Sequence, residues 1–555
     1  MKGEQAAVTS TADGTVVKPI CQPAEIDSAP NRHEPAALPE IGLASPIQWM
    51  ISRFAQLADA WFELGASRAI VILLFLFVVI WTGFQVLSSI TTNLQPDFVE
   101  MYAWSRHPAL GYYKHPPLGA FITAIWFAIF PAKDWAFLLL AVLNAAAALF
   151  MVDLIARRYL TADKRIAVIL LLLLTPFYQF RAVPFGANQT LLATWPAAVY
   201  CFLRAVETRR PGWGAAAGVA AALAMLGKYY SIFLIAGLIA AALTHPQRRA
   251  YLRSCSPWIS TAVGLALLAP HLLWLVTTGY LPVHYALSVH AATSATALLL
   301  QIMMYPAGAI AYVSVLLAAY FIAVQPRVAT LQQALWPLNP EHRMLAVLLW
   351  VPLIAPIPVA IAAGALLSSL WTMPAWFLLP ILLLIPQDSV LRRRHGIGFA
   401  AAVAATTLIA IVAAPGIAWV RFVGGGGPRL YFRLAADAAS AQFKSKTGKS
   451  LSIVTGDMDL ANGTTFYGES HPDALPFFDL KAAPWVTPAR LAAEGWVALC
   501  KIGDQYCVNS AAEFVRGRSD TLRTALHLTP RAFGVSGPAS DFMMLVVPAS
   551  RSPPD

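Results

Sequence analysis

Long apolar runs that recur over most of the chain are the feature that most constrains its fold. The first run, Ile70–Ile80 (IVILLFLFVVI), contains no polar residue. A membrane-spanning helix needs about 20 mostly apolar residues, and a single buried core does not require so many such runs. The chain is 58% hydrophobic and 12% charged, whereas soluble domains carry about 25% charged residues. The sequence therefore predicts an α-helical polytopic membrane protein with about 11–13 spans.

The spans that we predict most directly are apolar segments separated by polar or charged loops. They lie near 69–90, 135–156, 165–181, 189–204, 213–226, 229–244, 257–278, 297–324, 344–365, 369–386 and 396–419. Another apolar segment, Leu118–Phe130, is short. If it spanned the membrane, every later loop would change sides, and the loops rich in Lys and Arg would lie outside. We therefore interpret it as a re-entrant or interfacial helix.

Clusters of Lys and Arg indicate the orientation. They occur in the loops 157–165, 204–210, 248–253 and 392–394, and such residues collect on the cytoplasmic side of a membrane. The loops between these clusters carry almost no Lys or Arg. This pattern predicts a cytoplasmic N-terminus and a C-terminus on the outer side, which is the periplasm if the membrane is a bacterial inner membrane.

Composition divides the chain into three parts. Residues 1–50 are predicted to form a disordered cytoplasmic tail because the segment is polar and Pro-rich. Residues 51–423 form the predicted membrane-embedded domain, and 424–555, which open on a GGGG break, form a small α/β periplasmic domain. This last part is nearly neutral, so the net charge of +11 reflects membrane topology and does not indicate a nucleic-acid partner.

Cys500 and Cys507 lie close together in the predicted periplasmic domain. Such spacing in an oxidising compartment favours a small disulfide loop, and two free thiols are the alternative. No further Cys or His pair lies nearby in the sequence, which argues against zinc at this place.

The outer loop 91–117 combines acids, aromatic residues and cations. Asp97 and Glu100 come first, followed by Lys114, His115 and a Pro-Pro pair. A carboxylate there can accept a proton from an attacking hydroxyl, and neighbouring cations can stabilise negative charge on a leaving phosphate. Since Asp97 follows Pro96 at the start of a helix-like run, a plain capping or first-turn acid is the alternative.

Two further cations are candidate phosphate ligands. Lys228 separates two apolar segments at the outer tip of a predicted hairpin, where a lysine needs water, a partner or an anion. Arg181 lies in a short outer loop; for both residues, simple snorkelling to the interface is the alternative. His284 and His290 lie in another outer loop, and their spacing does not suggest a helical metal-binding pair.

An ordered set of short motifs resembles glycosyltransferase family 39, which includes protein O-mannosyltransferases and bacterial enzymes that glycosylate lipid A and lipopolysaccharide. The matching segments are Asp97–Glu100, Gly111–Leu118 (GYYKHPPL), Asn188–Leu192, Leu226–Tyr230, Pro270–Trp274 and Trp371–Trp376, with Thr455–Asp457 and Phe466–Gly468 in the C-terminal part. The resemblance implies a GT-C-type fold, and it implies that Asp97 is the catalytic carboxylate, with Lys114 and His115 near the phosphate of the donor.

The matching segments also contain the other predicted substrate-binding residues, which are Tyr113, Asn188, Gln189 and Tyr229. Many relatives carry a second acid where this chain has Gln189, so Glu100 is expected to take part of that role. No cofactor is implied with certainty, and a divalent metal remains an open alternative.

The resemblance implies a glycosyltransferase that moves a sugar from a polyprenyl-phosphate carrier to a hydroxyl of an envelope acceptor. Lipid A, lipopolysaccharide or another lipid fits better than protein. A lipid or sugar transporter or flippase is the alternative, although the spans carry few charges and show no internal repeat. A non-catalytic envelope assembly protein is a third possibility.

The predicted orientation can be tested with reporter fusions after Arg394 and after Gly427. We expect the two fusions to report opposite sides of the membrane, because one predicted span, 396–419, lies between them. Signals from the same side would refute the span count and the re-entrant interpretation of Leu118–Phe130.

Overall fold

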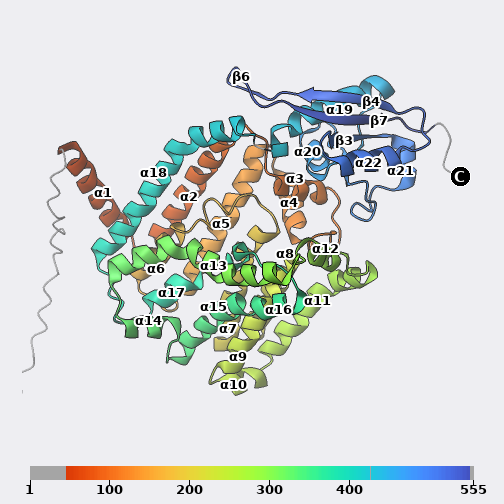
Figure 1. Cartoon of the computed structure of the whole chain (residues 1–555). Helices are drawn as coiled ribbons and strands as arrows, with labels where there is room; N and C mark the ends of the chain where they lie inside the picture. The colour runs from red at the N-terminus through yellow and green to blue at the C-terminus, as the bar shows by residue number, and fades with distance from the viewer. Residues whose placement is uncertain (1–44, 426, 551–555) are drawn as a thin grey trace, which may run out of the picture. The chain divides into compact units, whose positions relative to one another are not determined.

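The computed structural model describes residues 45–425 and 427–550, and it confirms the predicted fold class (Figure 1). Within this part of the chain, six helical segments are long and apolar enough to cross a membrane. They are α2 (Ala66–Ser88), α5 (Asp134–Ala156), α11 (Ser256–Thr277), α13 (Ala295–Val324), the pair α15 (Pro340–Ile354) and α16 (Pro356–Ala363), and α18 (Arg393–Val423).

The other helices of the membrane part are outside this group of six, and all of them except α7, which has 22 residues, are shorter than a typical span. They are α4 (Leu118–Ile129), α6 (Ala162–Leu173), α7 (Ala187–Thr208), α8 (Pro211–Gly227), α9 (Ile232–Thr244), α10 (Arg248–Arg253), α12 (Leu281–Val289), α14 (Val328–Leu335) and α17 (Leu378–Leu384). Helix α4 has 12 residues, which is too short to span a bilayer without help from neighbouring segments.

Two predicted spans are wrong as continuous helices. The segment predicted at 165–181 becomes α6, which ends at Leu173 before Pro176. The segment predicted at 369–386 becomes a short 3-10 turn (Ser369–Thr372) and then α17, with Pro374 between them. Proline lacks an N–H and disfavours helical geometry in the residue before it, so apolar composition alone overestimated both helices.

Helix α1 (Ser45–Glu63) was not predicted and begins inside the segment assigned to the tail 1–50; residues 1–44 lie outside the described part. A single guanidinium holds the end of α1. Arg393, at the start of α18, lies 2.8 Å from Asp59 Oδ1, 2.6 Å from Glu63 Oε1 and 3.3 Å from Asp163 Oδ1. This ion-pair network joins α1, α6 and α18.

The cationic loops contact one another at one end of the helical part. Arg158 pairs with Glu207, and Arg209 donates a hydrogen bond to Gln247, so the loops that follow α5, α7 and α9 meet. The predicted orientation requires these cationic loops to lie at the same end of the helices, as they do. That this end faces the cytoplasm stays a prediction.

The C-terminal part contains a five-stranded mixed sheet in the order β2-β1-β3-β7-β4. Its strands are β1 (Ile453–Gly456), β2 (Asp473–Pro476), β3 (Trp496–Lys501), β4 (Leu522–Leu528) and β7 (Ser540–Val547), and a small hairpin is formed by β5 (Arg531–Ala532) and β6 (Val535–Ser536). The first three strands pair in parallel, and β7 runs antiparallel to β3 and β4. Helices α19 (Phe432–Thr447), α20 (Met458–Tyr467), α21 (Pro488–Glu494) and α22 (Gln505–Phe514) complete the domain.

Helix α20 positions the C-terminal domain against α3 (Pro96–Ser105) of the membrane part. Asp457 caps α20 by accepting a hydrogen bond from the Leu460 amide at 2.9 Å. The Phe466 ring packs edge-to-face on Tyr102 at 4.9 Å between centroids, and His107 Nε2 lies 2.6 Å from Asp473 Oδ1. Because α20 leaves the sheet directly after β1, the sheet determines where these contacts form.

The sheet domain contains the Cys500–Cys507 disulfide that the sequence predicts. A bridge closing so short a loop stabilises a fold by about 2–3 kcal/mol. We expect neither cysteine to react with maleimide in unreduced protein, whereas Cys255, which is free and exposed, should react and serve as an internal control. Peptide mass spectrometry measures both, and labelled Cys500 and Cys507 in unreduced protein would contradict the disulfide.

Candidate active site

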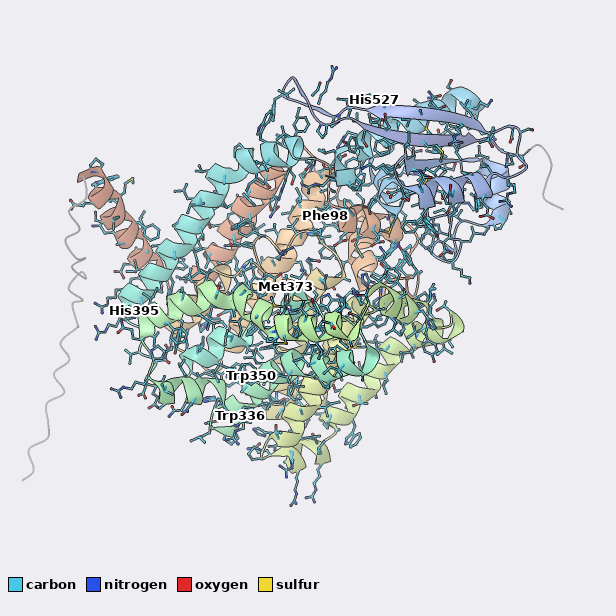
Figure 2. All side chains as sticks on the ribbon, viewed as in Figure 1. Phe98, Trp336, Trp350, Met373, His395 and His527 are labelled. Carbon is cyan, nitrogen blue, oxygen red and sulfur yellow. A yellow bond between two sulfur atoms is a disulfide. The ribbon has the colours of Figure 1, made fainter. Side chains whose placement is uncertain are left out.

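Both predicted catalytic acids lie on α3, a helix that is mostly buried against its neighbours. Pro96 starts the helix with a fixed φ that suits the first turn, and Asp97 follows in that turn. Phe98 is 1% exposed and packs on Phe137 of α5 with 4.7 Å between ring centroids. Figure 2 shows Phe98 between the helices and the C-terminal domain, far from Trp336 at the other end of the helical part. The buried face of α3 therefore fixes the direction of its two acids.

Asp97 remains accessible, and none of the described residues forms a hydrogen bond or an ion pair with its carboxylate. Gly186 lies beside it: a Cβ built on Gly186 would be 3.6 Å from Asp97 Cβ and 3.8 Å from Asp97 Oδ2. Although the side chain is exposed, the surrounding protein partly desolvates the carboxylate and raises the pKa of Asp97, while the Lys114 and Lys228 ammonium groups oppose that shift. A carboxylate with free lone pairs and a raised pKa is suited to accept a proton.

Glu100 is committed to an ion pair one turn further along α3. Lys114 Nζ lies 2.7 Å from Glu100 Oε1, and the two side chains are 10% and 8% exposed. Tyr113 donates a second hydrogen bond to the same oxygen at 3.3 Å. Burial would lower the pKa of Lys114, but the Glu100 carboxylate outweighs burial and raises it. Lys114 is therefore a cation held in one place.

His115 follows Lys114 and is neutral at physiological pH. Burial lowers its pKa to about 3, and the nearby Lys228 and Lys114 ammonium groups add to this shift. The sequence suggested that His115 could be a cation facing phosphate. Its environment instead makes it a neutral hydrogen-bonding group beside two lysines.

Lys228 lies between α8 and α9 and reaches the start of α7. Its Nζ donates a hydrogen bond to Asn188 Oδ1 at 2.6 Å and lies 4.8 Å from the centre of the Trp371 ring. Neither partner carries a negative charge, so the ammonium is oriented but not neutralised. The hydroxyl of the adjacent Tyr229 forms a hydrogen bond with His271 Nε2 at 3.1 Å. This bond connects the tip of the hairpin to α11.

Gln189 lies in the first turn of α7, and Arg181 lies on the loop that precedes this helix. Gln189 Nε2 donates to the Arg181 carbonyl at 3.0 Å, and Gln189 Oε1 is buried without a hydrogen-bond partner among the described residues. That oxygen would lie 3.4 Å from a Cβ on Gly186, so it is close to Asp97. The Arg181 side chain is exposed, and in the described part of the chain no hydrogen bond or ion pair joins it to the other site residues.

Helix α20 contributes residues that the sequence did not reveal as site residues. Met458 Sδ lies 3.0 Å from Lys114 Nζ and 3.1 Å from the Tyr113 hydroxyl oxygen. Asp459, the next residue, has a pKa raised to about 6 by burial and by the negative charges of Asp457, Glu100 and Asp97. The only available signal was the family-like segment 455–457 directly before them.

Helix α12 closes another side of the site. The Tyr285 ring packs edge-to-face on Tyr113 at 5.6 Å, and Lys114 Nζ lies 5.7 Å from its centre. His290 packs on Trp371 with 4.9 Å between centroids. Across the described residues, no group of three or more His, Cys, Asp or Glu side chains is arranged to hold a metal ion.

Part of this arrangement lies within a segment that matches a known family. The model of the dolichyl-phosphate-mannose-protein mannosyltransferase family matches residues 114–274. The predicted resemblance is confirmed. The matched segment contains Lys114, His115, Asn188 and Lys228, and no curated protein matches the chain significantly in sequence.

Solved structures show the same fold. ArnT from Cupriavidus metallidurans bound to undecaprenyl phosphate is 15% identical with a TM-score of 0.53, and the alignment covers 87% of this chain and 99% of that chain. The apo state of the same protein gives 15% identity and a TM-score of 0.52, with 86% and 98% coverage. The GT-C-type fold expected from the sequence is therefore present, with its C-terminal domain included in the match.

The Glu100–Lys114 pair predicts a specific stability effect. Glu100→Gln should destabilise the protein by about 3 kcal/mol, because it leaves the Lys114 ammonium buried without its counter-ion. The double variant Glu100→Gln/Lys114→Met should recover most of that loss, because it removes the buried charge as well. Thermal unfolding of the purified protein in detergent measures both effects, and additive losses in the double variant would contradict the pairing.

Proposed function

We propose that the chain is a membrane glycosyltransferase that takes a sugar from a polyprenyl-phosphate carrier and transfers it to a hydroxyl of an envelope acceptor. One observation carries the proposal: an unpaired carboxylate, Asp97, lies in one site with an unneutralised ammonium, Lys228. The family match over 114–274 and the fold of ArnT, which was solved with undecaprenyl phosphate, support it.

The transfer step requires one base and one stabiliser of negative charge. The acceptor oxygen forms a bond to the anomeric carbon of the sugar while Asp97 takes the hydroxyl proton. The bond between that carbon and the phosphate oxygen breaks, and the polyprenyl phosphate leaves with both electrons of the bond. Its negative charge grows during this step, so a cation in place before the reaction lowers the barrier.

The two lysines divide the cationic role. Among the described residues, Lys228 forms its hydrogen bond with the neutral Asn188 amide and pairs with no carboxylate, so its charge is available to the donor phosphate. Lys114 is already paired with Glu100 at 2.7 Å, and it contributes a fixed positive field and a spare N–H donor. The neutral His115 and Tyr113 supply hydrogen bonds in the same loop, and Gln189 Oε1 offers an unused acceptor next to Asp97.

An apolar groove provides room for the carrier chain. It has a volume of about 470 Å³ and runs along α8, α9 and α11. Met225 and Ile232, which flank Lys228 in sequence, line the groove, and Trp258 lines it further along α11. A phosphate held at Lys228 would therefore have an apolar path for its prenyl chain along the membrane-facing side of these helices.

The geometry favours this reaction over transport. A transporter places its ionisable residues near the middle of the bilayer, between repeats. Here the acids lie on α3, outside the long apolar helices, and Met458 and Asp459 of the sheet domain close over them. An acceptor that reaches Asp97 must therefore come from the side of the membrane that carries the sheet domain.

The finer assignments belong to the same proposal. The bias of Lys and Arg toward the cytoplasmic side supports a cytoplasmic position for the end of the helices that carries the cationic loops. We therefore infer that the site and the sheet domain are periplasmic and that the membrane is the bacterial inner membrane. Lipid A, lipopolysaccharide or another lipid hydroxyl is the proposed acceptor, since the accessible Asp97 carboxylate lies on α3, outside the long apolar helices.

Asp97→Asn is the decisive variant. It keeps the shape of the side chain and removes the base, so transfer should fall by about 10²–10⁴ while donor binding persists. Because burial raises the pKa of Asp97, the charged form destabilises the fold above the unfolded-state pKa, and the variant should unfold at the wild-type temperature or higher near pH 7. Sugar transfer from a polyprenyl-phosphate donor to extracted envelope lipid, measured with purified protein, tests the first expectation.

Lys228→Gln separates binding from proton transfer and serves as the companion variant. It should weaken donor binding as well as turnover, because the phosphate is charged before the reaction begins. Lys501→Gln, on the exposed surface of the sheet domain, is the matched control and should change neither. Transfer by Asp97→Asn at close to the wild-type rate would refute the proposed role of Asp97.

A further inference from the structure

A second groove lies where the membrane helices meet the sheet domain. It has a volume of about 610 Å³, and none of its lining residues is among the site residues described above. The end of α2, the segment that follows it and the start of α5 form one wall. Helix α19 and the β5–β6 hairpin form the other, and Figure 1 shows this hairpin projecting from the sheet toward the end of α18.

Cations predominate in this groove. Lys133, Arg433 and Arg531 line it, together with one acid, Asp134. Arg433 lies 3.9 Å from Asp134. The Tyr467 hydroxyl also interacts with that carboxylate, so Asp134 is shared between two partners. Within residues 45–425 and 427–550, the side chains of Lys133 and Arg531 have no hydrogen bond or ion pair with protein.

Two more arginines increase the positive charge behind the groove. Arg421, near the end of α18, donates to the Ser88 carbonyl at 3.0 Å. Burial lowers the pKa of Arg429, and the positive charge of Arg421 adds to that shift. Cations this close to one another repel unless an anion lies among them. Such a concentration is also contrary to the bias that keeps Lys and Arg off the outer side of membrane proteins.

The groove lies at the level of lipid head groups. Ser88 ends α2, Asp134 starts α5 and Val423 ends α18, and each of these helices is long and apolar enough to span a membrane. Large apolar side chains line the groove and face outward: Ile90 is 57% exposed, Trp135 43% and Phe533 76%. Aromatic residues at the ends of spans are typical of the membrane–water interface.

The β5–β6 hairpin is built to hold its apolar tip in place. Phe533 and Gly534 adopt positive φ of 50° and 81° at the turn, and a Cβ on Gly537 would lie 2.9 Å from the Phe422 ring of α18. This close contact anchors the base of the hairpin at the end of a span. Phe533 therefore projects beside the cations rather than folding back into the sheet.

We propose that this groove binds the phosphate head group of an anionic membrane lipid. Lys133, Arg433 and Arg531 contact the phosphate oxygens, for which Arg is suited by its paired N–H donors, and the acyl chains lie along Ile90 and Trp135. The lipid comes from the leaflet on the side of the sheet domain, and it joins that domain to the ends of α2 and α5.

The test compares two triple variants with the same loss of charge. The first is Lys133→Gln/Arg433→Gln/Arg531→Gln. The second, Lys501→Gln/Arg516→Gln/Arg523→Gln, removes one Lys and two Arg from exposed positions elsewhere on the sheet domain. Native mass spectrometry of the full chain in micelles measures retention of phosphatidylglycerol, with phosphatidylcholine and soluble glycerol phosphate as comparison probes.

We expect the groove variant to retain phosphatidylglycerol at least tenfold less than the wild type, and the control variant to retain it normally. The variant Lys133→Arg/Arg531→Lys preserves the charges and should retain the lipid, which separates loss of binding from misfolding. Retention by the groove variant within twofold of the wild type would overturn the proposal. Equal retention of phosphatidylcholine, or equal binding of soluble glycerol phosphate, would also overturn it, because the site would then not be specific for an anionic lipid.

Discussion

The buried ion pair between Lys114 and Glu100 is the interaction on which the arrangement of the site depends. Two charges so far from water are tolerated only when each satisfies the other, and the 2.7 Å contact fixes both groups. Because Glu100 is engaged by Lys114 and Tyr113, it cannot also serve as a free base. Asp97, one turn earlier on the same helix, is left as the carboxylate with available lone pairs.

The two lysines of the site differ in the charge of their partners. Lys114 has a carboxylate partner, whereas Lys228 is held by an amide and an aromatic face. A site with one neutralised and one available cation binds an anion without becoming strongly positive when empty. The neutral state of His115 follows from this balance, since a third positive charge beside two ammonium groups would be unfavourable.

Much of this site could be predicted from sequence because charge among apolar residues is costly and therefore informative. Lys228 between two apolar runs and the acids of 91–117 are visible in that way. Met458 and Asp459 could not be recognised in the sequence. Met458 contacts Lys114 across a separation of 344 residues, and a contact between such distant segments produces no pattern in the sequence. The span predicted at 369–386 failed for another reason: hydropathy does not register where Pro374 interrupts a helix.

Helix α20 explains why a sheet domain is part of a membrane-embedded site. Its first residue, Met458, contacts Lys114, and its last, Tyr467, accepts a hydrogen bond from the Leu94 amide at 2.8 Å. One helix of 10 residues therefore holds the loop after α3 and the segment before it. Loops of this length are mobile unless both ends are tied, and a base must stay within hydrogen-bond reach of its proton. The position of Asp97 consequently depends on the docking of a domain that begins more than 300 residues later in the chain.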